Sequence, residues 1–133
     1  MRKTEQQKIG KKGERIAVRY LRRHGCRVLA KNRHEGRNEL DIVVRDGGFI
    51  AFVEVKTRSF DSATTADVRP AAAVDQAKRQ RTVRAARDYL AAHPTKLCPR
   101  LDVIEVYLDR SKRLKPFKIN HIPAAFSPTG RLL

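Results

Sequence analysis

Two apolar runs of strand length, separated by a pair of glycines, constrain the fold of this chain more than any other stretch. The runs are residues 39–44 (ELDIVV) and 49–57 (FIAFVEVKT), and residues 45–48 between them read Arg-Asp-Gly-Gly. Asp-Gly and Gly-Gly steps suit the positive φ values of tight hairpin turns. The pattern therefore predicts an antiparallel β-hairpin.

The hairpin carries charged residues inside otherwise apolar strands. Because side chains alternate between the faces of a strand, Glu39 and Asp41 share a face of the first strand, and Glu54 and Lys56 share a face of the second. Like charges across a sheet are destabilising unless something compensates them. Paired carboxylates with a nearby lysine suit a divalent-cation site for phosphate chemistry, since Mg²⁺ is typically held by one or two carboxylates plus substrate phosphate. The alternative interpretation is a set of ordinary salt bridges on an exposed sheet face.

The register of the hairpin decides whether the acids meet. If residues 47–48 form a two-residue loop, Asp41 lies directly opposite Glu54. If residues 46–47 do, Asp41 opposes Phe52 and is diagonal to Glu54, still on the same side. A three-residue loop would separate the two acids, and the sequence alone does not exclude it.

The charge of the chain favours a polyanionic partner. The sequence has 30 Lys and Arg against 14 Asp and Glu, a formal net charge of +16. We expect nucleic acid and no membrane, because the sequence has no long apolar run. The N-terminus leads into no apolar segment of signal-peptide length, so we expect a cytoplasmic protein. Cys26 and Cys98 lack metal-ligand spacing and are expected to be reduced, and each histidine is expected at the surface.

The remaining pattern predicts an α/β fold in which helices flank a mixed β-sheet. The helix after the hairpin acts as a crossover, which favours parallel pairing of the strand that follows it. A single domain of residues 1–119 would be followed by an irregular tail, residues 120–133. The expected helices are residues 4–24 and 74–92, the further strands are 26–30, 100–107 and 115–119, and the main loops are 32–38 and 59–73.

Both predicted helices are basic outside an apolar stripe. In the first, Glu14 is the exception: it lies at the edge of the stripe, from which it would reach over the hairpin. An ion pair with Lys11 or Arg15 is an equally good interpretation. Gly10 and Gly13 weaken this helix and allow close approach of another segment. The expected stripe of the second helix is Val74, Ala77, Val83, Ala86 and Leu90.

Motifs spread over roughly residues 8–107 have a known counterpart. They are Gly13-Glu14, Asn32-Arg33, the ELDIV of residues 39–43, the FVEVKTR of residues 52–58, Val74 with Lys78, and the RLDVI of residues 100–104. This pattern resembles the YraN family, which looks like a branch of the PD-(D/E)XK nuclease superfamily close to the archaeal Holliday-junction resolvases. FVEVKTR is the most specific part. The resemblance implies a restriction-endonuclease-like core.

The resemblance also implies a role for the charged residues of the hairpin. Asp41 and Glu54 would bind Mg²⁺ or Mn²⁺, with the Val55 carbonyl as a third ligand. Lys56 would be the catalytic lysine, and Glu14 the helix acid beside the site. The metal would acidify a bound water and shield the phosphate, while Lys56 orients or deprotonates that water or stabilises the transition state.

Further residues are assigned supporting roles. Strand parity places Glu39 on the face of the proposed site, as an auxiliary acid. Asp102 is expected to be structural, in an ion pair with Arg100. The expected phosphate contacts are Arg58, Lys78, Lys11, Lys12 and Arg33.

The resulting prediction is a metal-dependent endonuclease that acts on DNA, in particular branched or single-stranded DNA. The alternative is a nucleic-acid-binding protein that keeps the nuclease scaffold without turnover, because an intact motif is not activity. A third interpretation, a basic ribosome-associated protein, leaves the acids of the hairpin unexplained. A homodimer would suit a symmetric four-way junction, an expectation that comes with the resemblance.

Overall fold

The computed structural model describes residues 3–66 and 76–126. The elements are α1 (Glu5–Arg23), β1 (Arg27–Glu35), β2 (Asn38–Asp46), β3 (Phe49–Phe60), α2 (Gln76–Ala92), β4 (Cys98–Asp109), a 3₁₀ turn (Arg110–Lys112) and β5 (Lys115–Ile122). The five strands form one sheet in the order β1-β2-β3-β4-β5. Only β3 and β4 are parallel, and the other neighbours are antiparallel. The predicted α/β class with a mixed sheet, and the parallel pair across the helical crossover, are confirmed.

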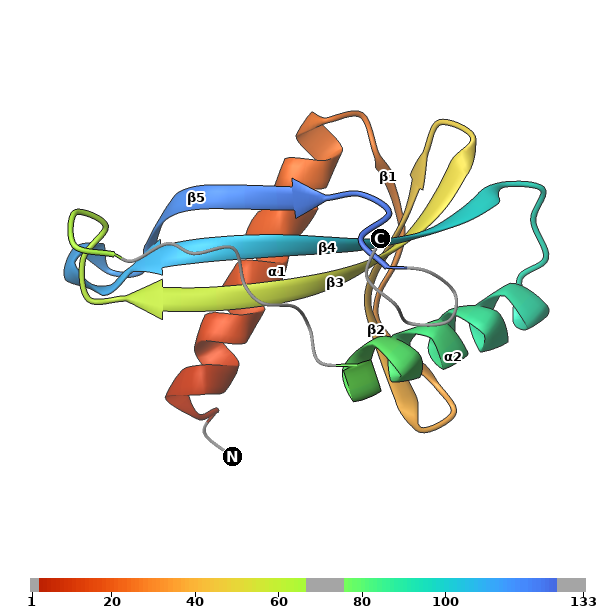
Figure 1. The fold of residues 1–133 in the computed structure, drawn as a ribbon, viewed down its shortest axis with the longest axis horizontal. Coiled ribbons are helices and arrows are strands. Elements are labelled where there is room, and N and C mark those ends of the chain that lie inside the picture. The colour runs from red at the N-terminus through yellow and green to blue at the C-terminus, as the bar shows by residue number, and fades with distance from the viewer. Residues whose placement is uncertain (1–2, 67–75, 127–133) are drawn as a thin grey trace.

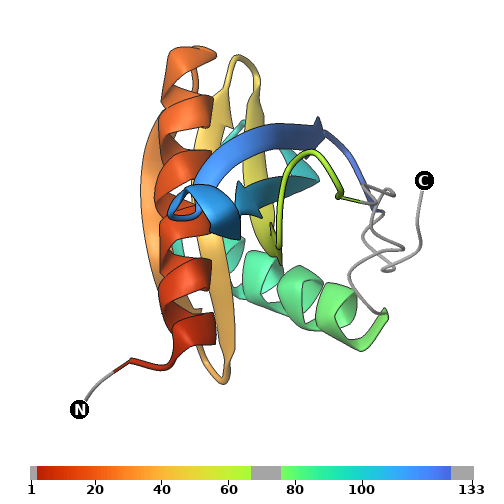
Figure 2. The same cartoon turned by 90° about the vertical axis from the view of Figure 1, so that its left-hand side faces the viewer.

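The two helices cover opposite faces of the sheet, α1 on one side and α2 on the other (Figure 1, Figure 2). On the α1 face, Leu21 packs in one core with residues such as Ile104. On the α2 face, Tyr89 packs in a second core with residues such as Phe52. Each face of the sheet therefore has its own hydrophobic core. Neither helix of the described ranges has the length and apolar character needed to cross a bilayer.

Helix α1 is fixed at its start and pressed closely onto the sheet. Thr4 and Gln7 form a capping box, in which each side chain accepts a hydrogen bond from the other residue's backbone N–H. A Cβ placed on Gly13 would come within 1.8 Å of Thr57 Oγ1 on β3, whereas nothing lies within 4 Å of one placed on Gly10. The close approach that the sequence suggested is therefore made at Gly13.

The β2–β3 hairpin has the first of the registers considered above. Asp46 pairs with Phe49, and the ladder continues to Ile42 opposite Val53. The loop is thus the two-residue pair Gly47-Gly48, and Gly47 has φ +58°. Continued by one residue, this register brings Asp41 and Glu54 together.

The β2–β3 ladder ends at Ile42 and Val53, and the two strands then separate. Beyond this point β2 continues along β1, down to the pair of Asn38 with Glu35. Beyond the same point, β3 leaves β2 and stays paired with β4 as far as Phe60. Figure 1 shows the two strands running apart. We call this divergence the fork.

The predicted loop at residues 32–38 is wrong. β1 is longer than the predicted strand of residues 26–30 and extends to Glu35, so only a two-residue turn separates it from β2 at Asn38. The polar composition misled the prediction because β1 is an edge strand, where exposed positions tolerate polar side chains. Asn32, inside this strand, has φ +47°, in the left-handed region that asparagine tolerates better than most residues.

The predicted tail begins too early. β5 runs to Ile122, the Ala125 N–H donates to the Leu101 carbonyl at 2.8 Å, and Phe126 is buried on the α2 face. Ala125 and Phe126, which follow Pro123, pack into the core on the α2 face and hold this segment against the sheet. The predicted loop at residues 59–73 is also displaced, because its first two residues belong to β3 and residues 67–73 lie outside the described ranges.

Helix α2 follows most of the predicted stripe. Val83 and Ala86 are buried and Leu90 packs against them, as expected, whereas Ala77 is exposed. Val74 lies outside the described ranges. Tyr89 is buried as well, a position that the aliphatic stripe did not include.

Candidate functional site

The fork brings two acidic side chains together inside the sheet. Because β2 no longer pairs with β3 beyond Ile42, the backbone N–H of Val55 has no β2 carbonyl to bond. The Asp41 carboxylate takes that place, and Val55 N donates to Asp41 Oδ2 at 2.9 Å. One oxygen of Asp41 is therefore fixed by the backbone beside Glu54. We call Asp41 and Glu54 the fork pair.

Glu54 is buried and meets a cation from the opposite layer. Only 2 % of the residue is exposed. Lys78 of α2 places its Nζ 2.5 Å from Glu54 Oε1. The sheet thus presents the acid and the helix presents the base, in a contact between residues that no local pattern connects.

Burial dominates the titration of the fork pair. Burial is the largest cause that raises the pKa of Glu54, the charge of Asp41 also raises it, and Lys78 lowers it; together they bring this pKa to about 7. Burial also raises the pKa of Asp41, against the Val55 hydrogen bond and the charge of Lys78. The two carboxyls titrate as a unit that retains a proton close to neutral pH. This pair is poor at holding two negative charges without a further cation.

The chemistry of these donors fits a hard divalent cation held by few protein ligands. Within residues 3–66 and 76–126 there is no group of three or more His, Cys, Asp or Glu side chains arranged to hold a metal. A cation at the fork would therefore use Asp41, Glu54, a main-chain carbonyl such as that of Val55, and water. Mg²⁺ is commonly held in this way. The Val55 N–H donates to Asp41, and this hydrogen bond keeps the backbone of Val55 beside the fork pair.

Glu14 approaches the fork from the α1 face. Burial raises its pKa, and the charge of Asp41 raises it further. Lys11 Nζ lies 3.8 Å from Glu14 Oε2, so the ion pair considered above is present. That oxygen is buried, with no hydrogen-bond partner in the described part of the chain. Glu14 thus forms an ion pair with Lys11, and its pKa also responds to the charge of Asp41.

Asn32 is a residue of this region that sequence reasoning missed. A hydrogen bond from its side chain lowers the pKa of Glu14. Its Oδ1 is buried and finds no hydrogen-bond partner among the described residues, and its backbone is left-handed at φ +47°. Strained backbone and an unsatisfied polar atom at one position are typical of functional sites. The Asn-Arg step of the quoted motifs was the available signal.

Lys56 and Glu39 lie near the fork but are exposed. Lys56 follows Glu54 on the same face of β3 and stands opposite Glu105 of β4. Glu39 pairs with His34 in the β1–β2 ladder, and its charge raises the pKa of Asp41 and of Glu14. Both are open to solvent and to a bound substrate.

Two cavities meet at Asp41, one on each face of the sheet. A cavity of about 590 Å³ lies beside α1 and also contacts Glu14 and Asn32. A cavity of about 310 Å³ lies beside α2 and also contacts Glu54 and Lys78. Both are rich in cations. The first is lined by Lys11, Arg15, Arg19, Arg22, Arg23 and Lys31, and the second by Arg37, Lys78 and Arg81.

The expected phosphate contacts do not form one group. Lys12 donates to the Arg113 carbonyl at 3.1 Å. Arg33 pairs with Glu35 at 3.0 Å, and the Arg58 guanidinium lies 5.4 Å from the centre of the Phe60 ring. Three of the five are therefore held by protein partners other than the fork pair. Lys11 and Lys78 are the two that line the cavities at Asp41.

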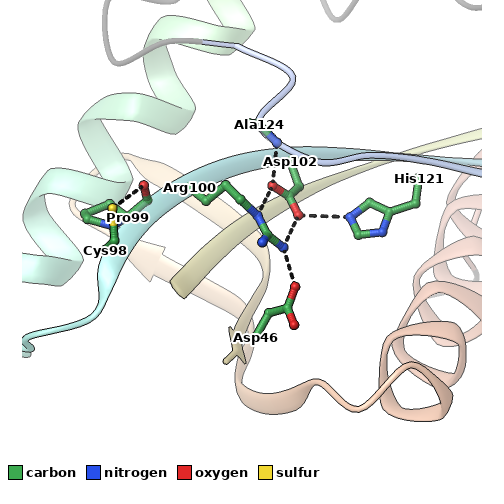
Figure 3. Close-up of polar contacts among 7 residues, drawn as sticks. All are labelled: Asp46, Cys98, Pro99, Arg100, Asp102, His121 and Ala124. Carbon is green, nitrogen blue, oxygen red and sulfur yellow. Dashed lines mark hydrogen bonds and ion pairs between the residues drawn. The ribbon is translucent and has the colours of Figure 1, made fainter. Parts of the chain in front are cut away.

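A second buried carboxylate, Asp102, lies elsewhere on the sheet (Figure 3). Arg100 donates Nε to its Oδ1 at 2.9 Å and Nη2 to its Oδ2 at 3.0 Å, which confirms the predicted ion pair. The His121 Nε2 lies 2.9 Å from Oδ2, and the Ala124 N–H donates to Oδ1 at 3.0 Å. Arg100 also bonds Asp46 at 2.9 Å. We call these five residues the Asp102 cluster.

The Asp102 cluster corrects one expectation. His121, expected at the surface, is largely covered, with 15% of its side chain accessible. Outside the cluster, both cysteines are free, as expected, Cys26 buried and Cys98 exposed. Burial alone would raise the pKa of Asp102, but the hydrogen bonds from His121 and Arg100 lower it below its usual range. This cluster is a satisfied structural ion pair.

Fold and site together define a small α/β protein with an acidic pair at a sheet fork, one acid buried and the other half-buried, beside two basic cavities. Residues 13–106 match the family described as "Uncharacterised protein family UPF0102", and the chain belongs to that family. This confirms the YraN resemblance at the level of the family.

Relatives from distant bacteria cover most of the chain. A UPF0102 protein of Koribacter versatilis is 41% identical over 110 residues, 81% of this chain and 74% of the relative. One of Chlorobaculum parvum is 40% identical over 89% of this chain and 91% of the relative. One of Caldanaerobacter subterraneus is 39% identical over 95% of this chain and all of the relative, at 100%.

Proposed function

We propose that this protein is a metal-dependent endonuclease that hydrolyses phosphodiester bonds in DNA, in particular branched or single-stranded DNA, on a restriction-endonuclease-like core of the PD-(D/E)XK superfamily. The observation that carries the proposal is the fork pair. Asp41 is a half-buried and Glu54 a buried carboxylate, both with raised pKa values, side by side where β2 and β3 separate. Groups with such pKa values concentrate at functional sites.

Asp41 and Glu54 would hold Mg²⁺ or Mn²⁺, together with the Val55 carbonyl. The bound metal supplies positive charge for the phosphate and a more acidic water. The protein's own contribution is positional. The Val55 N–H holds one Asp41 oxygen, so the carboxylate is fixed beside Glu54, with which it also shares a side-chain hydrogen bond. Burial keeps water from screening the charges of the pair.

Lys56 would act at the substrate. It is exposed on the face of β3 that carries Glu54, so its ammonium can bind a non-bridging phosphate oxygen or the attacking water. Either contact stabilises negative charge that develops in the transition state. Glu14, on the α1 face, would assist from the other side of Asp41, and Glu39 is the auxiliary acid at the mouth of the α2-side cavity.

The basic cavities support DNA as the partner. Arginines and lysines line both sides of Asp41, and the whole chain carries a net charge of +16. Arginine and lysine side chains bind the phosphates of nucleic acids, and the affinity of such a protein for DNA falls strongly as the salt concentration rises. The fork would then receive a phosphodiester whose flanking phosphates are held by the cavity walls.

The test is cleavage of branched, duplex and single-stranded DNA with Mg²⁺ or Mn²⁺. We expect Asp41→Asn and Lys56→Ala to lower the rate at least ~100-fold, the usual scale for loss of one acid–base or charge-stabilising group. Lys96→Ala, an exposed lysine in the loop before β4, serves as the control and should cleave like the wild type. Undiminished cleavage by both site variants would contradict the proposal.

A second candidate is a DNA-binding protein that keeps this scaffold without turnover. It is favoured by the lack, within the described residues, of a third acidic or histidine ligand grouped with the fork pair. Binding that weakens with salt, without cleavage under any metal, would select it.

A further inference from the structure

The contact between Lys78 and Glu54 has a chemical consequence for cation binding. The Lys78 ammonium touches Glu54 Oε1, one of the two oxygens through which this carboxylate would bind a cation at the fork. Lys78, Glu54 and Asp41 line the same cavity of about 310 Å³. A divalent ion and the ammonium are therefore rivals for one carboxylate.

We propose that Lys78 is a resident counter-cation of the metal-free site, which a divalent ion must displace from Glu54 in order to bind. This inference rests on the proposed function and assigns a positioning role to a residue of α2. It replaces the expectation that Lys78 is one of many phosphate contacts. Displacement leaves the ammonium in the same cation-lined cavity, above the fork.

Three features of the contact support exchange rather than a permanent structural pair. The Lys78 side chain is 42% exposed, whereas that of Glu54 is 3% exposed, so the ammonium can leave without opening the core. Lys78 also lines the same cavity as both fork acids, so its ammonium stands where a bound cation would stand. A lysine ammonium is also a flexible point charge, unlike the rigid fork of an arginine.

The cavity offers a matched control. Arg81 lies three residues further along α2, is exposed, and lines the same cavity. Replacing either residue by methionine removes one positive charge from the cavity wall. Only the Lys78 substitution also removes the rival of the metal. Comparing the two separates displacement from a general change of field.

The experiment is titration of Mn²⁺ into the full-length protein without DNA, by calorimetry at pH 8.5, where fewer protons compete for the carboxylates. We expect Lys78→Met to bind Mn²⁺ about tenfold more tightly than the wild type, and Arg81→Met within about threefold of it. Lys78→Arg keeps the positive charge, and a guanidinium can donate two parallel hydrogen bonds to one carboxylate. This variant should therefore bind Mn²⁺ more weakly than the wild type. It also covers the case in which Lys78→Met fails to fold.

The outcomes separate the two proposals. Equal changes in Lys78→Met and Arg81→Met, or unchanged binding by Lys78→Arg where Lys78→Met fails to fold, would overturn the counter-cation role and leave the metal site standing. Lack of Mn²⁺ binding by all four proteins would overturn the proposed metal site and this inference with it. Selective tightening in Lys78→Met supports both.

Discussion

The carboxyl groups of Glu54 in the fork pair and of Asp102 in the Asp102 cluster are both buried, but their pKa values shift in opposite directions. Glu54 is 2% exposed and Asp102 is fully buried, at 0%. Yet the pKa of Glu54 is raised to about 7, whereas that of Asp102 is lowered. Burial therefore does not decide the difference. The supply of donors does, because Asp102 accepts from a guanidinium, an imidazole and a backbone N–H, while the fork pair shares one ammonium and one N–H.

We interpret the difference as the one between a structural site and a candidate functional site. A satisfied buried carboxylate ties strands together and contributes to folding. A pair of acids with too few hydrogen-bond donors and positive charges lowers the stability of the metal-free protein. Such a loss of stability is retained in proteins at sites that bind a ligand. The predictions below try to break this distinction, in order of expected effect.

The largest effect is expected from Arg100→Met. It leaves the Asp102 charge in the core without its main partner, which should lower the free energy of unfolding by about 3–5 kcal/mol. Arg110→Met is the control, because Arg110 pairs at 2.7 Å with Asp61, whose side chain is 91% exposed. That exposed pair should contribute less than about 1 kcal/mol. Urea denaturation measures both, and equal losses would contradict the structural role of the Asp102 cluster.

The pH dependence of stability should carry the signature of the fork pair. The folded protein holds a proton between the usual Glu54 pKa of 4.5 and about 7, and the unfolded chain does not. The free energy of unfolding should therefore fall as the pH rises through this window, by ~3 kcal/mol at 1.36 kcal/mol per unit. It should be level above this window.

The Asp102 cluster has the opposite sign. Its lowered pKa adds stability that is lost only as the pH falls below the usual value of 3.8.

The prediction for the fork pair is tested by urea denaturation from pH 4 to 8.5 in the presence of a chelator. Glu54→Gln should remove the fall in the free energy of unfolding with rising pH. Stability that rises from pH 4.5 to 7 in the wild type would refute the assignment.

Asp41→Asn should stabilise the protein at pH 7.5, by about 1–2 kcal/mol. The substitution removes one of two like charges, and the amide oxygen can still accept the Val55 N–H. Glu39→Gln, an exposed acid two residues earlier on β2, should change stability by less than ~0.5 kcal/mol. A loss of stability in Asp41→Asn would place the fork pair with structural sites such as the Asp102 cluster.

Sequence reasoning reached the fork pair through local rules. Strand alternation and a glycine turn define which hairpin residues face each other, so the register of Asp41 and Glu54 followed from a choice between few loops. The fork itself did not follow, because the point at which β2 leaves β3 depends on pairing with β1 and β4. The contact of Lys78 with Glu54 joins a helix to a strand across a long connection, which no periodicity reveals.

The residues around the two carboxylate sites were harder to predict for a related reason. Asn32 stood in a segment that composition assigned to a loop, although edge strands accept polar residues. His121 lies in a segment of mixed polar and apolar residues, Asn120-His121-Ile122, and its partner Asp102 lies on the neighbouring strand. In both cases the partner is distant in sequence, so the residue types alone predicted exposure.

The last comparison concerns the helix that brings Glu14 to the fork, where the expected changes are no larger than that at Asp41. Gly13→Ala should destabilise by about 1–2 kcal/mol, because the new methyl group would overlap Thr57 of β3. Gly10→Ala, on the same helix with free space around it, should instead stabilise by about 0.5–1 kcal/mol through helix propensity. If α1 must lie this close for Glu14 to act on Asp41, Gly13→Ala should also slow cleavage under conditions where it is fully folded. Equal stability changes in the two variants would mean that α1 can move off β3 freely, and that the fork, unlike the Asp102 cluster, is not held by its surrounding layers.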